Sequence, residues 1–302
     1  MMIRPSHFGF NPMTAESNAF QMADPGDSPE KISMLARREF DTSIDNLIKA
    51  NIDVIPFEDE DNKILPDSVF PNNWISFHDD GTVVLYPMMA ENRRLERRTD
   101  ILLQLQEKGF SINRILDYTS QELDARYLEG TGSVVFDHVN RIAFANHSPR
   151  TDSSVFKKLC SDLNYRDLLF NAVDPSGLDI YHTNVLMCIG TQFVVICLEA
   201  IHNDAQRREL LNASEQTGHE VIEISYGQLS SFVGNMLEVR KKDGDNAIIM
   251  SESAYNSLDA KQRSLLSGFG DLIVLTIPVI EKYGGGSARC MIAGIHLPKI
   301  NA

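Results

Sequence analysis

The chain has 302 residues, of which 43% are hydrophobic and 23% charged, and its formal net charge is −14. These values are ordinary for a globular protein, and the length allows one large domain or two modest ones. The negative charge argues against a nucleic-acid-binding protein, which needs a basic face to replace phosphate counterions. It does not exclude a small anionic or zwitterionic ligand, because a few arginines can reverse the field inside a pocket.

The four cysteines form no CxxC pair and no Cys/His cluster, so the sequence does not predict a structural zinc site. Residues 1–7 contain no apolar signal region, and no stretch approaches the roughly 18 apolar residues of a membrane span. We therefore expect a cytoplasmic protein that does not bind a membrane.

The first part of the chain predicts a helix over 37–51, followed by a short strand over 53–57. Alternating apolar residues on both sides of an Asp-Asp-Gly turn predict a β-hairpin over 70–86. Apolar residues at helical spacing then predict one helix over 91–109, which ends at the cap residue Gly109.

The same order of hairpin and helix recurs three more times along the chain. The predicted pairs of hairpin and helix are 129–145 with 152–163, 182–197 with 204–217, and 234–250 with 258–266. A last hairpin is expected to begin at Cys290, directly after the run Gly284-Gly285-Gly286. Three consecutive glycines predict a flexible loop that can close over a ligand.

The repeat is regular, because the landmarks Asn73, Gly130, Asn184, Asn235 and Cys290 follow one another at intervals of 57, 54, 51 and 55 residues. A repeat of about 50 residues is typical of a propeller or an array rather than of a two-domain chain. We therefore expect a single domain over residues 1–302. Its first residues are expected to complete the unit that Cys290 begins and so to close a ring.

In such a ring the first strand of each unit starts near the central axis. Glu129, His182 and Cys290 all stand at that phase of the repeat. A thiolate that attacks, an imidazole that moves protons and a carboxylate are the groups needed for nucleophilic acyl-type chemistry. Each residue alone also has a structural explanation, as a turn carboxylate, a strand histidine or a buried free cysteine. Their common phase favours a catalytic site.

Two arginines follow the repeat as well, since Arg93 and Arg150 each lie 20 residues after a landmark. A pair of guanidinium groups suits the carboxylate of an α-amino acid, which can accept bidentate hydrogen bonds. Because several other arginines lie beside Arg93 in the sequence, Arg93 could instead be a solvated residue at a helix start. For the same reason a neighbouring arginine could bind the carboxylate in its place.

Six short motifs occur in an order and spacing that resemble one enzyme superfamily. They are Phe70-Pro71-Asn72-Asn73, Glu129-Gly130-x-Gly132, Ser148-x-Arg150-Thr151, His182-Thr183-Asn184, Gly234-Asn235 and Ser287-x-x-Cys290. Over essentially its whole length the chain resembles the guanidino-group-modifying enzymes of the pentein fold, namely arginine deiminase, dimethylargininase and the amidinotransferases. The resemblance implies an α/β fold, a five-bladed αβ propeller, and no metal or organic cofactor.

The resemblance also implies roles for individual residues. Cys290 would be the nucleophile that forms a thiol adduct, His182 the general acid/base, and Glu129 the carboxylate beside the histidine. Three further residues would contact the substrate. Arg93 and Arg150 would bind its carboxylate, and Asn235 would make a polar contact.

Two positions depart from the deiminase pattern, because Asn73 and Asn184 replace aspartates that hold the cationic guanidinium. An asparagine offers a neutral acceptor and an NH₂ donor instead of a charge. These replacements suit a neutral ureido group, so the nearest resemblance is to the citrulline-utilising hydrolases. The expected reaction converts citrulline to ornithine, ammonia and carbon dioxide.

Two alternatives stay open at this point. The first is an arginine deiminase, dimethylargininase or amidinotransferase that acts on a guanidino substrate. The second is a catalytically silent propeller that serves as a binding module. The expected partner is a small amino-acid substrate, and the sequence allows a homodimer without predicting one.

Overall fold

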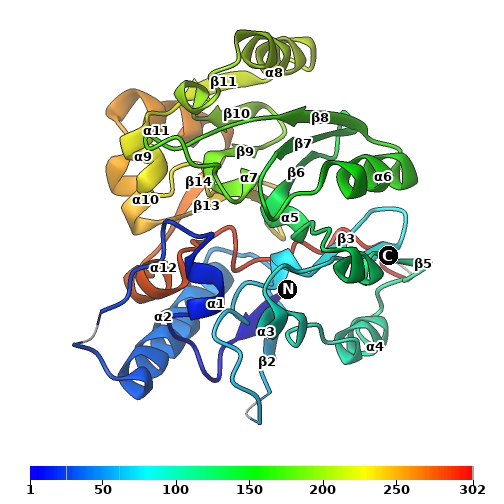
Figure 1. Ribbon diagram of the computed structural model, residues 1–302, viewed down its shortest axis with the longest axis vertical. Coiled ribbons are helices and arrows are strands. Elements are labelled where there is room, and N and C mark those ends of the chain that lie inside the picture. The colour runs from blue at the N-terminus through cyan, green and yellow to red at the C-terminus, as the bar shows by residue number, and fades with distance from the viewer. Residues whose placement is uncertain (25, 61, 301–302) are drawn as a thin grey trace.

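In the computed structural model, which describes residues 1–24, 26–60 and 62–300, the strands form five separate small sheets (Figure 1). One sheet is the parallel pair of β1 (Met2–Arg4) and β2 (Pro56–Glu58). Each of the others joins an antiparallel hairpin to a third strand that runs parallel to the hairpin's second strand. The architecture is a mixed α/β fold in which no sheet closes on itself within the described ranges.

The four three-stranded sheets follow one another along the chain. They consist of β3 (Ile75–Phe77), β4 (Thr82–Leu85) and β5 (Arg114–Asp117); β6 (Val134–Asp137), β7 (Ile142–Asn146) and β8 (Arg166–Phe170); β9 (Met187–Ile189), β10 (Phe193–Ile196) and β11 (Glu220–Glu223); and β12 (Leu237–Arg240), β13 (Asn246–Ser251) and β14 (Asp271–Leu275). The hairpins agree with the sequence prediction. The parallel edge strands β5, β8, β11 and β14 were not predicted, because their exposed residues weaken the apolar alternation that marks a strand.

The helices lie around these sheets, with the longer ones α2, α4, α6, α8 and α11 at the periphery (Figure 1). The α-helices are α1 (Pro12–Ala15), α2 (Pro29–Lys49), α3 (Glu91–Arg94), α4 (Asp100–Glu107), α5 (Gly130–Ser133), α6 (Ser153–Leu163), α7 (Thr183–Leu186), α8 (Asp204–Gln216), α9 (Tyr226–Ser230), α10 (Glu252–Ser257), α11 (Ala260–Phe269) and α12 (Pro278–Gly284). The short 3₁₀ helices of the described residues are η1 (Pro71–Asn73), η2 (Thr119–Asp124) and η3 (Leu198–Ala200). No helix of the described chain is long and apolar enough to cross a membrane.

The single helix predicted over 91–109 is wrong, because the structure has two helices, α3 and α4, in its place. Between them Leu95, one of the apolar residues at helical spacing on which that prediction rested, is 58% exposed. Arg93 and Glu96 point inward instead and form a buried ion pair with an N–O distance of 2.9 Å. The inward-facing Arg93–Glu96 pair thus stands where a continuous helix from α3 to α4 would have its apolar stripe.

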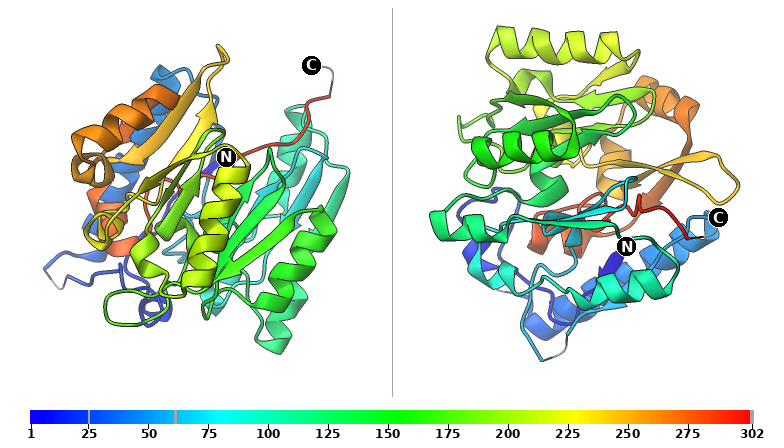
Figure 2. Two further views of the ribbon diagram at one scale, coloured as in Figure 1. Left: turned by 90° about the horizontal axis from the view of Figure 1, so that it is seen from above. Right: turned by 90° about the vertical axis from the view of Figure 1, so that its right-hand side faces the viewer.

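The strand predicted to begin at Cys290 is also wrong, since no strand follows this residue in the described part of the chain. The main chain of Ala293 instead exchanges hydrogen bonds of 2.9 and 3.0 Å with Met1. The N-terminal strand and the C-terminal segment therefore lie side by side, as Figure 2 shows.

The three glycines before Cys290 do not form the expected flexible loop, because all three are buried. Gly284 is the last residue of α12, and Gly285 ends that helix with a φ of +61°. A Cβ atom at Gly284 would lie 2.7 Å from the ring of Phe70. The glycines are needed for close packing rather than for freedom of movement.

The residues predicted at the starts of the first strands belong to short helical turns that precede β6 and β9. Gly130–Ser133 forms α5 and Thr183–Leu186 forms α7. Gly130 has a φ of +49°, and a Cβ atom there would lie only 2.2 Å from the main-chain oxygen of Asn72. This close approach brings η1 and α5 together, and α7 also packs against α5.

Candidate active site

A narrow cavity lies where α12, η1 and the turns before β6 and β9 meet. It is lined by five of the predicted catalytic and substrate-binding residues and by seven further residues, namely Asn73, Arg93, Arg150, His182 and Cys290, together with Thr14, Asn18, Asp67, Phe70, Tyr181, Gly284 and Gly286. Its volume of about 10 Å³ is close to the space that a single water needs. The cavity must therefore open before an amino acid can enter.

Cys290 is 3% exposed and receives two side-chain hydrogen bonds at its sulfur. Asn184 Nδ2 and Asn235 Nδ2 both lie 3.3 Å from Cys290 Sγ. The orientation of the Asn235 amide is fixed because its Oδ1 accepts from the main-chain N–H of Arg289 at 3.1 Å. Both asparagines therefore contact the predicted nucleophile itself.

His182 is 2% exposed, and its Nε2 lies 2.8 Å from Glu129 Oε2. Burial lowers the pKa of His182 to about 4, although the neighbouring Glu129 acts in the opposite direction. The imidazole is therefore neutral at pH 7, with Nε2–H donating to the carboxylate. The Tyr181 ring packs on the imidazole with a centroid distance of 4.5 Å and restricts its movement.

Glu129 is fully buried and holds His182 in place. Burial raises the pKa of this carboxyl group, but Arg150 and His182 outweigh burial and leave the pKa below its ordinary value. Glu129 Oε1 accepts from the main-chain N–H of Met89 at 3.0 Å, and Oε2 lies 3.3 Å from Arg150 Nη1. The site thus contains an ionised carboxylate that orients a neutral histidine.

Arg150 connects the carboxylate to the N-terminal part of the chain. Its Nε and Nη2 donate to Ser17 Oγ at 3.1 and 2.7 Å, and Nη2 also donates to the main-chain oxygen of Thr14 at 3.0 Å. The guanidinium lies over the Tyr181 ring, 5.0 Å from its centroid. Residues 14–18 thus cover one side of the cavity and use donors of Arg150 that a substrate carboxylate would otherwise receive.

Arg93 is buried and already has a carboxylate partner. Its Nε and Nη2 donate to Glu96 at 2.9 Å each, and its Nη1 donates to Asn73 Oδ1 at 2.8 Å. In this structure Arg93 orients Asn73, and its contact with a substrate carboxylate stays a prediction. Because Asn73 Oδ1 accepts from Arg93, the NH₂ group of the amide is assigned to the position that points away from Arg93.

Asn73 Nδ2 is a buried donor with no hydrogen-bond partner within the described ranges. A Cβ atom at Gly132 would lie 2.4 Å from this nitrogen and 2.7 Å from two ring atoms of His182. Only glycine at this position leaves room for both side chains. The motif Glu129-Gly130-x-Gly132 therefore has a physical reason in the site itself.

Asp67 is the main residue that sequence reasoning missed. Its Oδ2 accepts from Asn11 Nδ2 at 2.7 Å, whereas its buried Oδ1 has no partner in the part of the chain that the structure describes. Burial raises the pKa of this carboxyl group, and Arg93 only partly offsets that effect. Its nearness to Phe70-Pro71-Asn72-Asn73 was the one available signal. Asn18, which also lines the cavity, lies 55 residues before Asn73 and so fits the spacing of the repeat.

The predicted site residues thus meet in one place, either in the cavity wall or one hydrogen bond behind it. Glu129 lies behind His182, and Asn184 and Asn235 lie behind Cys290. No group of three or more His, Cys, Asp or Glu side chains in residues 1–24, 26–60 and 62–300 is arranged to hold a metal ion.

Three solved structures share this fold. The N-terminal domain of ArgZ, an arginine dihydrolase from the ornithine–ammonia cycle in cyanobacteria, has a TM-score of 0.71 and 17% identity, with 99% of this chain and 96% of that chain covered. AgrE in complex with L-arginine has a TM-score of 0.72 and 16% identity, with 96% of this chain but 39% of that chain covered. A dimethylarginine dimethylaminohydrolase, solved as an adduct with 4-chloro-2-hydroxymethylpyridine, has a TM-score of 0.63 and 11% identity, with 96% of each chain covered.

A comparison with curated protein sequences found no match. The family model described as N,N dimethylarginine dimethylhydrolase, eukaryotic, matches residues 4–297. The chain therefore belongs to the N,N-dimethylarginine dimethylhydrolase family, within the pentein superfamily of guanidino-group-modifying enzymes, and it is a hydrolase of carbon–nitrogen bonds.

Proposed function

We propose that this protein is a cysteine hydrolase that converts citrulline to ornithine, ammonia and carbon dioxide through an adduct on Cys290. The observation that carries the proposal is the unpaired NH₂ group of Asn73 in the cavity wall. We also propose that the five sheets are the blades of a pentein propeller around this site.

The proposal rests on hydrogen-bond complementarity. A guanidinium group carries only donors toward its surroundings, whereas a ureido group carries a carbonyl oxygen that accepts. Arg93 fixes the Asn73 amide so that it offers a donor, and a buried donor without an acceptor is costly. A ureido oxygen satisfies this donor, whereas a guanidinium would place one donor against another.

The remaining polar groups of the cavity suit the amino-acid end of such a substrate. Asp67 Oδ1 has a free acceptor for the α-ammonium group, and Arg150 offers donors for the α-carboxylate. Since residues 14–18 now use these donors, the substrate takes them over when that segment moves aside.

The chemistry follows from the order of the contacts. The neutral imidazole of His182 takes the proton of the Cys290 thiol as Sγ, which accepts from Asn184 and Asn235, attacks the ureido carbon and forms a C–S bond. The carbonyl oxygen takes the electron pair and is stabilised by the Asn73 NH₂ group. When the tetrahedral centre collapses, one C–N bond breaks, and the imidazolium of His182, held by Glu129, passes the former thiol proton to the departing amine.

The second half of the reaction releases the enzyme. The neutral imidazole removes a proton from a water molecule, whose oxygen attacks the adduct carbon. The C–S bond then breaks, and the imidazolium returns the proton to Cys290 Sγ. The resulting carbamic acid loses carbon dioxide and yields the second amine. One water is consumed for each citrulline, and ornithine, ammonia and carbon dioxide are the balanced products.

A guanidino amino acid is the second candidate substrate, and one observation favours it. The unpaired Asp67 Oδ1 is an anionic acceptor that could face a guanidinium instead of an ammonium group. The structural neighbours support the same candidate, since one is described as an arginine dihydrolase and another was solved with L-arginine.

Kinetics on a substrate panel test the proposal. We expect citrulline to have a higher kcat/KM than arginine or N,N-dimethylarginine, measured as ornithine formed, and we expect no turnover by Cys290→Ser. Faster turnover of either guanidino compound would contradict the citrulline proposal and favour a guanidino amino acid as the substrate. Full activity of Cys290→Ser would refute the thiol mechanism for every substrate.

A further inference from the structure

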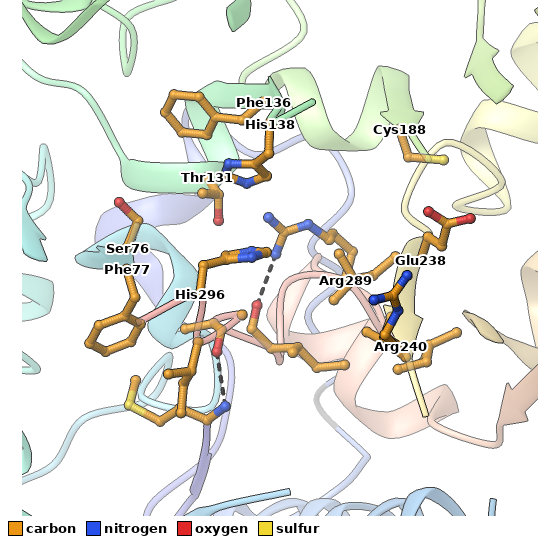
Figure 3. A pocket seen from close by; sticks show the side chains of 18 of the residues that line it. Ser76, Phe77, Thr131, Phe136, His138, Cys188, Glu238, Arg240, Arg289 and His296 are labelled. Carbon is orange, nitrogen blue, oxygen red and sulfur yellow. Dashed lines mark hydrogen bonds between the residues drawn. The ribbon is translucent and has the colours of Figure 1, made fainter. Parts of the chain in front are cut away.

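A second cavity, much larger than the first, lies on the other side of Asn184. Its volume is about 500 Å³, which lies within the range of small-molecule binding sites in proteins. Its walls are mainly apolar and aromatic, and they include Phe77, Phe110 and Phe136. Figure 3 shows that a few polar side chains from separate elements point into this space. The catalytic proposal makes no use of this cavity.

Arg289 supplies a positive charge inside this second cavity. Its Nη1 donates to the main-chain oxygen of Ile292 at 2.8 Å, and no carboxylate of the described residues lies within ion-pair distance of it. Figure 3 shows its guanidinium directed toward His138 and His296. A largely buried guanidinium that lacks a counter-ion is costly, and a bound anion would remove that cost.

Two histidines, His138 and His296, lie beside the guanidinium (Figure 3), and His78 lies next to His138. The rings of His138 and His296 have a centroid distance of 4.3 Å, and those of His78 and His138 a distance of 6.1 Å. Burial lowers the pKa of His78 to about 4 and that of His138 to about 2, with neighbouring histidines adding to the effect. Burial also lowers the pKa of His296. At pH 7 the rings can donate or accept hydrogen bonds without adding charge.

The carboxylates of the cavity wall do not neutralise Arg289, because they have other partners. Asp137 accepts from the main-chain and side-chain nitrogens of Asn140 at 2.9 and 2.8 Å. Glu238 accepts from the main-chain N–H of Thr191 at 2.8 Å. The remaining lining carboxylate, Asp53, is exposed and lies 4.0 Å from Lys299. The interior of the cavity thus has an unpaired positive charge next to apolar walls.

We propose that this second cavity is a binding site for a small organic anion with an apolar or aromatic body, anchored by Arg289. The negative group pairs with the guanidinium, and His138 and His296 provide further hydrogen bonds. The apolar body packs against the phenylalanine side chains of the wall. An inorganic anion would leave these walls uncovered, so it binds more weakly.

The second cavity is connected to the nucleophile by short contacts. Arg289 precedes Cys290, and its main-chain N–H holds the Asn235 amide that donates to the sulfur. Asn184 lines the second cavity and also donates to Cys290 Sγ. The wall of the second cavity therefore includes one donor of the sulfur, Asn184, and also Arg289, whose main chain holds the other donor. Anion binding itself does not depend on which substrate Cys290 attacks.

Fluorescence titration with 8-anilinonaphthalene-1-sulfonate tests the proposal on the folded chain. The probe is an organic anion with an aromatic body, and benzoate serves as its competitor. We expect one probe per chain, displaced by benzoate, with a Kd that rises at least tenfold in Arg289→Gln and less than threefold in Arg289→Lys. Arg166→Gln is the matched control, since Arg166 is exposed and pairs with Glu209 at 3.5 Å.

A second variant keeps the test decisive if Arg289→Gln does not fold. Val239→Trp adds a large side chain to the cavity wall without changing its charge, and we expect it to abolish probe binding. Wild-type affinity in both Arg289→Gln and Val239→Trp would refute the site, and so would a wild-type protein that does not bind the probe. Running the titration on Cys290→Ser separates this result from the catalytic proposal.

Discussion

His182 Nε2 and Glu129 Oε2 lie 2.8 Å apart, although 53 residues separate them along the chain and neither side chain is more than 3% exposed. The carboxylate therefore fixes both the orientation and the tautomer of the imidazole. Because Arg150 keeps Glu129 ionised, the charge of one residue sets the proton position on another. This pair is the centre of the proposed acid/base chemistry.

Glu129→Gln removes the negative charge but keeps the size of the side chain. We expect kcat to fall by about 100-fold, because an amide holds the imidazole less well and does not stabilise its protonated form. Steady-state ornithine formation measures the change. Glu209→Gln on the exposed face of α8 is the control and should keep wild-type kcat. A Glu129→Gln enzyme with wild-type kcat would show that Glu129 only supports the fold.

Asn73→Asp tests why this enzyme would prefer a ureido group. The new carboxylate can pair with Arg93 Nη1, so the protein should still fold. The NH₂ donor toward the substrate oxygen is lost, and we expect kcat/KM for citrulline to fall at least tenfold. In the double variant Asn73→Asp with Asn184→Asp, kcat/KM for citrulline should fall further. Unchanged citrulline kinetics in both proteins would contradict the role given to Asn73.

Arg150→Gln tests the proposed contact with the substrate carboxylate. We expect kcat/KM for citrulline to fall about tenfold or more, which corresponds to about 1.4 kcal/mol of transition-state binding. N-carbamoylputrescine, which has the ureido group but no carboxylate, is the matched substrate control. Its kcat/KM should change much less. Equal losses for the two substrates would mean that Arg150 acts only through Glu129.

His138→Gln gives a stability prediction with a defined sign. The folded-state pKa of His138 is about 2, whereas the unfolded value is near 6.5. As the pH falls below 6.5, the unfolded chain binds a proton that the folded chain does not, so the wild type loses stability. The variant lacks this loss. Between pH 6.5 and 4.5 the stability of the wild type relative to the variant should fall by about 1 kcal/mol per unit.

Urea unfolding at pH 7.0, 6.0 and 5.0 measures this difference. Comparing the two proteins at each pH cancels the other titrating groups, among them Glu39, whose pKa burial raises to about 7. Parallel stability curves for wild type and His138→Gln would show that the ring titrates normally in the folded protein.

The convergence of the candidate residues could be predicted because a repeat carries information over long distances. Residues at one phase of a repeated unit occupy equivalent places, so Glu129, His182 and Cys290 could be assigned to one site although no local sequence connects them. The same reasoning predicted the hairpins and the helices α6 and α8. It failed at Cys290 itself, where packing of Gly284 against Phe70 sets the backbone and no strand forms.

Other features could not be predicted, because they depend on contacts that leave no local pattern. The bonds from Arg150 to Thr14 and Ser17 span more than 130 residues. Asp67 has the same residue type as many surface carboxylates, and only its burial and its unpaired oxygen distinguish it. The edge strands are short and half exposed, so hydrogen bonding to a neighbour rather than side-chain pattern defines them.

The most direct test of the proposed function is an internal competition between citrulline and arginine at equal concentrations in one reaction. With citrulline labelled by ¹³C at the ureido carbon, NMR follows its loss and the appearance of labelled carbon dioxide and bicarbonate, while chromatography follows arginine. The proposal predicts that citrulline is consumed first, with one ornithine for each labelled carbon released, and that Cys290→Ser consumes neither. Prior consumption of arginine, or loss of citrulline without labelled carbon dioxide, would contradict it.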